Sequence, residues 1–157
     1  MSVRRHASLA AVVVGLMLAA AIWWALGERS PPSLLEPDNA AVVARGSVVY
    51  AQSCAACHGA NLEGQPEWRT RLPSGRLPAP PHDADGHTWH HSDEVLFGIT
   101  RDGVAKYAPG HQSDMPAYAG VLSDADIRAV LSFIKSTWPA NIRAMHDRVN
   151  QQERPAR

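Results

Sequence analysis

The sequence predicts an all-α protein in which one membrane-spanning helix precedes a single helical domain. Residues 41–52, 92–103 and 123–138 have apolar side chains at helical intervals, whereas strand-like alternation is nearly absent. The chain has 157 residues, and roughly 100 to 130 of them remain for a folded domain once the N-terminal segment is set aside. This length fits one domain of ordinary size and excludes a multidomain enzyme.

The composition narrows the class of protein further. Lys and Arg number 15 and Asp and Glu also 15, so the formal net charge is 0. A nucleic-acid-binding domain would need a basic surface, and we expect no nucleic-acid partner. Two cysteines are too few for a disulfide scaffold. No carboxylate pair or nucleophile arrangement of a catalytic site stands out, which favours a protein that is not an enzyme.

The N-terminus predicts a membrane anchor. The twenty residues from Ala7 to Leu26 carry no charge, which is the length that a helix needs to cross a bilayer core. Arg4 and Arg5 precede this run, and Trp23 and Trp24 lie near its exit, where indole rings favour the membrane interface. We expect residues 1–6 in the cytoplasm, residues 7–26 as a transmembrane signal anchor and the rest of the chain on the other side.

A cleaved signal peptide is the alternative to an anchor. Small residues at Ala25 and Gly27 could form a cleavage site. In both cases the remainder is exported, in bacteria to the periplasm. Residues 27–39 contain three prolines and predict an extended linker with no core of its own.

The first two helices of the domain have distinct signals. Residues 41–52 carry Gly46 on the face of their apolar side chains, and a glycine inside a helix often marks the close approach of another helix. The second helix has Ser92 as its N-cap and ends at Gly103. Its predicted inward-facing residues are Val95, Leu96 and Ile99.

The third helix is delimited at both ends. Ser123 is a good N-cap, acidic residues follow it in the first turn, and Pro139 stops the helix. The apolar stripe between these ends comprises Ile127, Val130, Leu131 and Ile134, with Phe133 and Trp138 beside it. We expect the domain to span residues 40–139. The polar tail, residues 140–157, has a composition that suggests a frayed end or a partner contact.

Both cysteines fall in one motif, Cys54-Ala55-Ala56-Cys57-His58. The C-x-x-C-H pattern attaches c-type heme. Two thiols three positions apart project from the same side of a helical turn and can add to the two vinyl groups of one porphyrin. His58 can then bring an imidazole nitrogen to the iron.

Other functions of this motif are less well supported. A thioredoxin-like redox pair would need strands that alternate with helices. A structural zinc site would need four ligands, and the chain has no second cysteine pair. A disulfide between such close residues would close a very short loop and stabilise the fold little.

The motif and its surroundings resemble a known family. Gly46, Tyr50 and the motif up to Gly59 resemble the N-terminal helix of class I (monoheme) cytochromes c, in which a glycine and an aromatic residue pack against the C-terminal helix. Residues 123–139 resemble that C-terminal helix. The resemblance covers residues 40–138 and implies the cytochrome c fold. In this fold the N- and C-terminal helices cross, and further short helices and loops surround one covalent heme c.

The resemblance also implies a second ligand of the heme iron. Ser113-Asp114-Met115-Pro116 resembles the Met-Pro loop that supplies the distal ligand in this family. A methionine ligand raises the reduction potential and blocks exchange of small ligands, which suits electron transfer. Met145 lies in the polar tail and is a poor competitor. A packing role for Met115 and a histidine ligand, His111 above all, are the alternatives.

The loop between the first and second helices has two notable parts. In class I cytochromes a loop carbonyl next to a proline accepts the proton on the far nitrogen of the ligating histidine, and residues 78–81 could supply it here. Residues 82–91 then hold four histidines, His82, His87, His90 and His91. They indicate either a copper or zinc site or side chains that cap turns and bond heme propionates, with Trp89 on the heme edge.

These observations predict a one-electron carrier in the bacterial inner membrane, with a single membrane span and its heme domain in the periplasm. Cys54 and Cys57 hold one heme c covalently, and His58 and Met115 are the axial ligands of the iron. The expected partners are donor and acceptor redox proteins, such as a membrane oxidase or dehydrogenase. The alternatives are a heme subunit of a redox enzyme complex, a small-ligand sensor and a metal-handling module that uses residues 82–91.

Overall fold

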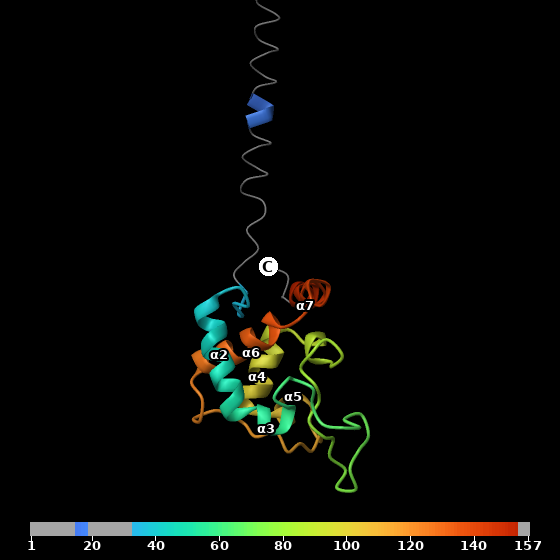
Figure 1. Ribbon diagram of the computed structural model, residues 1–157. Helices are drawn as coiled ribbons and strands as arrows, with labels where there is room; N and C mark the ends of the chain where they lie inside the picture. Colours follow the sequence, from blue (N-terminus) through green and yellow to red (C-terminus); the bar gives the residue numbers. More distant parts are fainter. Residues whose placement is uncertain (1–14, 19–32, 154–157) are drawn as a thin grey trace, which may run out of the picture. The chain divides into compact units, whose positions relative to one another are not determined.

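The computed structural model describes residues 15–18 and 33–153 (Figure 1). The chain divides into two units, residues 1–32 and 33–157. Residues 15–18 are helical. Most of the predicted membrane span, residues 7–26, lies outside the described residues, as do residues 1–6, which we expect in the cytoplasm. In the part of the chain that is described, no helix is both long and apolar enough to cross a membrane.

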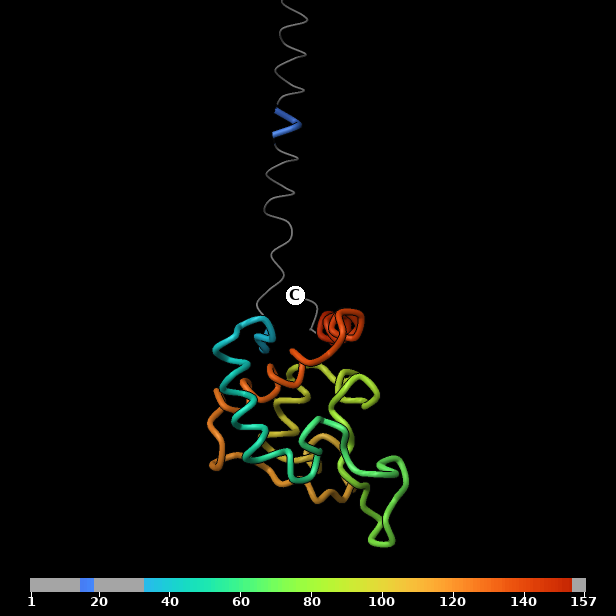
Figure 2. The backbone as a smooth tube through the Cα atoms, in the orientation of Figure 1, coloured from blue at the N-terminus to red at the C-terminus, as the bar shows by residue number. Residues whose placement is uncertain are grey.

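The second unit consists of helices and loops. Its helices are α2 (Ala40–Ser53), α3 (Ala55–His58), the 3₁₀ helix η1 (Thr88–His90), α4 (Asp93–Asp102), α5 (Val104–Tyr107), α6 (Asp124–Ser136) and α7 (Ala140–Gln152). Between residues 33 and 153 the only extended pairing is an isolated bridge from Ala119 to Leu122. The predicted all-α class is therefore confirmed. Figure 2 shows that the segment between α3 and η1 is a long irregular loop.

Helices α2 and α6 cross in close contact at Gly46. A Cβ atom on this residue would lie 2.0 Å from the carbonyl oxygen of Ala129 and 2.8 Å from Cβ of Phe133. Only a residue without a side chain allows this approach, because both of these atoms are fixed by α6. One turn further along α2, the rings of Tyr50 and Phe133 pack with centroids 5.5 Å apart. The predicted contact of a glycine and an aromatic residue with the C-terminal helix is confirmed.

The core lies along α6, whose apolar stripe is buried as predicted. The stripe residues and Trp138 are at most 5% exposed, and Val49, Tyr50, Leu62 and Leu96 pack in the same cluster. The Ser123 hydroxyl accepts the backbone N–H of Asp126 and so caps α6. Ser92 caps α4 in the same way. Of the predicted inward residues of α4, Leu96 is buried, whereas Val95 and Ile99 are half-buried.

The segment before α2 departs from the expectation of a free linker. Leu35 is 2% exposed and belongs to the core. Ser33 donates its hydroxyl proton to Asp93, and the backbone N–H of Glu36 donates to Ser132. The prolines do predict extended chain, but they carry no information about what one buried leucine can contact. Residues 33–39 are therefore part of the folded unit.

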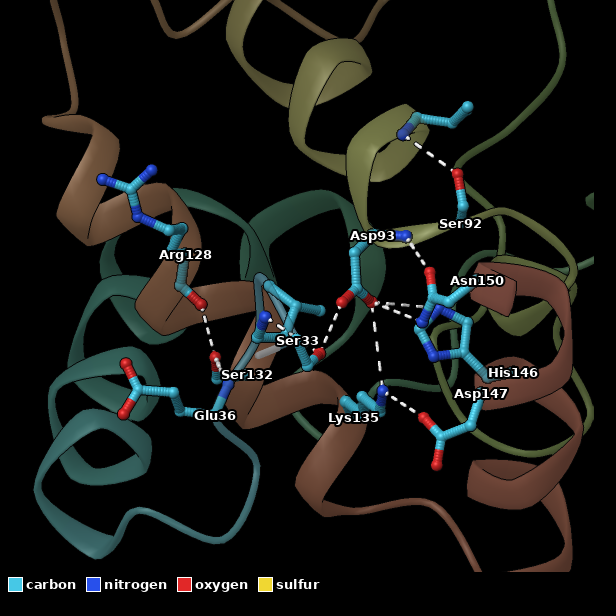
Figure 3. Close-up of polar contacts among 12 residues, drawn as sticks. Ser33, Glu36, Ser92, Asp93, Arg128, Ser132, Lys135, His146, Asp147 and Asn150 are labelled. Atoms are coloured by element: carbon cyan, nitrogen blue, oxygen red, sulfur yellow. Dashed lines mark hydrogen bonds and ion pairs between the residues drawn. The ribbon is translucent and has the colours of Figure 1, made fainter. Parts of the chain in front are cut away.

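The polar tail, for which the composition suggested a frayed end or a partner contact, is helical over most of its length. Residues Ala140–Gln152 form α7, which begins directly after Pro139 and packs beside η1. His146 on this helix is completely buried, and Asn150 bonds to Asp93 at the start of α4 (Figure 3). Asn150 and Asp147 of this helix have polar partners in the folded unit, Asp93 and Lys135, and composition alone does not reveal those partners.

Candidate heme site

The C-x-x-C-H motif sits where α2 ends and α3 begins. Cys54 terminates α2 through a 2.9 Å hydrogen bond from its N–H to the carbonyl of Tyr50. The carbonyl of Cys54 then accepts the N–H of His58 at 3.0 Å. Cys54 is half-buried, Cys57 is exposed, and both are free thiols. One helical turn thus presents two thiols and an imidazole together.

The ring of His58 has the tautomer and the neutral charge that a metal ligand requires. Its side chain is buried, with 7% of the residue exposed, and its Nδ1 lies 2.8 Å from the carbonyl oxygen of Pro80. A carbonyl can only accept, so Nδ1 carries the proton and Nε2 keeps its lone pair. Burial lowers the pKa of His58, although the bond to Pro80 opposes this. The ring is therefore neutral at pH 7, as a ligand to iron must be.

The carbonyl that orients His58 belongs to residues 78–81, the proline-rich segment in which the sequence predicts it. Among these four residues, Pro80 supplies the acceptor. The loop is fixed to the segment after the motif, because Gln65 and Ala79 exchange two hydrogen bonds of 2.9 Å. In addition, the N–H of His82 donates to the carbonyl of Leu62 at 2.8 Å. These contacts hold the Pro80 carbonyl in place on the side of His58.

The thiol chemistry argues against a redox dithiol. Burial, with a contribution from Cys57, raises the pKa of Cys54 to about 11. A disulfide-exchange pair needs a thiol whose pKa is lowered, because the thiolate is the nucleophile. The microenvironment of Cys54 therefore disfavours dithiol exchange.

Met115 lies in the loop between α5 and α6, half-buried. Residues on both sides of Met115 in the sequence make contacts that hold its loop in place. Asp114 pairs with Arg76 from the proline-rich loop, and Tyr118 donates its hydroxyl proton to the carbonyl of Ser53 at 2.6 Å. Ser53 immediately precedes the motif, and three residues of chain span at most about 10 Å. The methionine loop is thus tied to both the heme motif and the loop that orients His58.

The histidines of residues 82–91 do not converge. Over the described parts of the chain, no three His, Cys, Asp or Glu side chains are arranged to hold a metal ion. Instead His87 stacks on Trp68 and His90 on Trp89. Asp83 accepts the N–H groups of Asp85 and Gly86 and so caps a turn. The expected turn cap is therefore made by Asp83, and two of the histidines stack on tryptophan rings. The expected bonds to heme propionates stay a prediction.

One residue of the site was not recognised from the sequence. His82 stacks on the ring of His58 with centroids 4.0 Å apart and an interplanar angle of 23°. Burial lowers the pKa of His82 well below 6.5, and the neighbouring His58 and His87 lower it further. The position of His82 only two residues after Pro80 could have indicated a contact with His58. In the sequence, however, His82 looks like one of four equivalent histidines in the same loop.

The donor set fits a covalently attached heme: two free thiols three positions apart, followed by a buried neutral imidazole with a free Nε2. A family model described as Cytochrome c matches residues 43–138. Because the match covers more than half of the chain, the chain belongs to the cytochrome c family. It is a class I c-type cytochrome, a heme-based electron-transfer protein whose cofactor is covalently bound heme c. No curated protein and no solved structure matches it significantly.

Proposed function

We propose that the protein is a membrane-tethered, periplasm-facing carrier of single electrons with His58 and Met115 as the axial ligands of its heme iron. The observation that carries this proposal is the neutral, buried His58, which Pro80 orients beside two free thiols. Cys54 and Cys57 attach the porphyrin, so the heme is not lost after export. The heme supplies the redox chemistry, and the chain supplies ligation, burial and orientation.

The ligand on the second iron face decides what the heme can do. A methionine there fills the coordination sphere, raises the reduction potential and blocks the binding of small ligands, which suits electron transfer. Two contacts support Met115 as this ligand. Asp114 connects its loop to the proline-rich loop, and Tyr118 connects it to Ser53. Its partners are donor and acceptor redox proteins, and contacts of this kind are small and transient.

The membrane tether rests on the uncharged run from Ala7 to Leu26 and on the arginines before it. This arrangement keeps the heme domain close to membrane oxidases or dehydrogenases. Fractionation of cells that express the full chain tests this part of the proposal. The heme should remain in membranes after a carbonate wash, whereas recovery in the soluble periplasmic fraction would indicate that the segment is cleaved.

The axial ligands are tested by optical spectra of the full chain, made in cells competent for heme attachment. The parent should show a covalent c-type spectrum with the far-red sulfur-to-iron band, and Met115→Ala should lose this band, have a lower midpoint potential and bind carbon monoxide when reduced. Met145→Ala is the matched control, because Met145 lies on α7 and is 36% exposed. A parent without the band would point to another ligand, His111 first, and to a sensor or an enzyme subunit.

A further inference from the structure

His82 is held from three directions. Its backbone N–H donates to the carbonyl of Leu62 at 2.8 Å, and its carbonyl accepts the indole N–H of Trp138 at 2.7 Å. Its ring Nδ1 lies 2.8 Å from the hydroxyl oxygen of Thr88. Leu62 follows α3, Trp138 follows α6, and Thr88 is the first residue of η1. The position of His82 is therefore set by tertiary contacts on both the backbone and the side chain.

The orientation of the ring is also fixed. The buried hydroxyl of Thr88 lies 3.4 Å from the carbonyl oxygen of Pro81, which can only accept. The hydroxyl therefore donates to Pro81 and accepts from His82, so that Nδ1 of His82 carries the proton. Two consecutive carbonyls thus orient two rings: Pro80 orients His58 directly, and Pro81 orients His82 through Thr88.

The two rings meet face to face. Their centroids are 4.0 Å apart and their planes differ by 23°, and the ring of Tyr50 borders His82 edge-on at 6.4 Å. A hydrogen bond at one nitrogen fixes the direction of that N–H but allows the ring plane to turn about it. A flat neighbour on the ring face opposes this turn through packing. The contact with His82 therefore restrains a motion of His58 that the bond to Pro80 leaves free.

We propose that His82 is a positioning residue for the proximal heme ligand: its ring sets the rotational angle of the His58 imidazole about the bond to the iron. This inference rests on the proposed function in that it takes His58 as the ligand. The angle of an axial imidazole decides how its π orbitals overlap the iron d orbitals, and partner groups that orient a ligand tune the metal. His82 therefore shapes the electronic structure of the heme without contact with the iron.

The test compares two substitutions in the full heme-loaded chain. His82→Phe keeps a flat ring on His58 and loses the bond to Thr88, whereas His82→Leu fills a similar volume without a flat face. The readouts are the electron paramagnetic resonance g-values of the oxidised heme and the paramagnetic shifts of the heme methyl protons. We expect g-values close to the parent for His82→Phe, and shifted, broadened signals for His82→Leu. Thr88→Val, which removes the acceptor for the ring N–H, should give a smaller shift in the same direction.

His90→Ala is the matched control, because this ring stacks on Trp89 and has no contact with His58, and it should reproduce the parent spectrum. Parent-like spectra for both His82 variants, or equal shifts for both, would overturn the inference, since the flat face would then have no effect. Failure of the proposed function looks different, because it would appear in the parent itself as the lack of a low-spin histidine-ligated heme. A merely structural role would lower the melting temperature of His82→Leu and leave its g-values unchanged.

Discussion

His58 and His146 are both buried histidines, but they differ in hydrogen bonding and in the charge of the groups around them. His58 is 7% exposed, and its Nδ1 donates to the Pro80 carbonyl. His146 is 0% exposed, and neither of its ring nitrogens has a hydrogen-bond partner. The charged groups that act on His146 are Asp93, whose Oδ1 lies 3.5 Å from Nε2, Lys135 and Asp147. The ring of His58 is oriented by one loop carbonyl, and the ring of His146 lies among charged side chains.

The difference shows what each region is built to do. Around His58, one neutral acceptor, the Pro80 carbonyl, fixes the tautomer and leaves the lone pair of Nε2 available to a metal ion. Around His146, a buried ionic cluster joins segments that are far apart in the sequence (Figure 3). Lys135 bonds to Asp147 at 2.7 Å and lies 3.9 Å from Asp93, which also accepts from Ser33 and Asn150. This cluster fastens α7 and the segment before α2 to the domain.

The largest expected difference between the two regions is in heme content. His58→Ala removes the proposed iron ligand next to the motif cysteines, and we expect almost complete loss of the low-spin c-type spectrum. His146→Ala should keep a full complement of heme, because its ring contacts Trp138 and the ionic cluster and not the motif. The ratio of heme absorbance to protein checks both. A His146→Ala protein that lacks heme would show that the two regions are not separable.

The ionic cluster should contribute strongly to stability. The side chains of Lys135 and Asp93 are 3% and 6% exposed, and removal of one partner of a buried pair typically costs about 3 to 5 kcal/mol. We expect Lys135→Met to lower the free energy of unfolding by about 3 kcal/mol, as measured by denaturant titration of the heme-loaded protein.

Arg45→Met is the matched control for this prediction. Arg45 pairs with Asp126 at 2.7 Å, but its side chain is 59% exposed. Exposed pairs of this kind contribute about 0 to 1 kcal/mol. Equal losses for the two variants would contradict the proposed importance of burial in the cluster.

The smallest expected effect is a pH dependence that belongs to His146. Burial lowers its pKa below 6.5, and Lys135 lowers it further, whereas Asp93 and Asp147 oppose this. The unfolded state therefore binds more protons than the folded state below pH 6.5, and stability falls as the pH falls from 6.5 towards the folded-state pKa. The slope for one proton is at most about 1.4 kcal/mol per pH unit.

His146→Leu should flatten this part of the stability profile, which denaturant titrations between pH 5 and 7.5 would measure. The difference between parent and variant isolates His146 from the other histidines with lowered pKa values. A variant that keeps the parent's slope would assign the pH dependence to those residues instead.

The sequence by itself determined helices α2, α4 and α6 and the attachment motif, because these are properties of neighbouring residues. Ser92 and Ser123 cap helices through bonds to residues three positions away, and the periodicity of α6 fixes which of its faces is buried. Gly46 and Tyr50 could be assigned to the contact with α6 because the surrounding motif resembles the N-terminal helix of class I cytochromes c. The identity of Met115 as a ligand stays a prediction.

Only the tertiary structure decided which of several chemically equivalent residues does what. The sequence offered four residues as the source of the carbonyl for His58 and four histidines in one loop, and long-range packing selected Pro80 and His82. Composition described residues 33–39 and 140–153 as linker and tail, although Ser33 and Asn150 both bond to Asp93. Those partners lie 60 and 57 residues away along the chain, and no local pattern encodes a contact over such a distance.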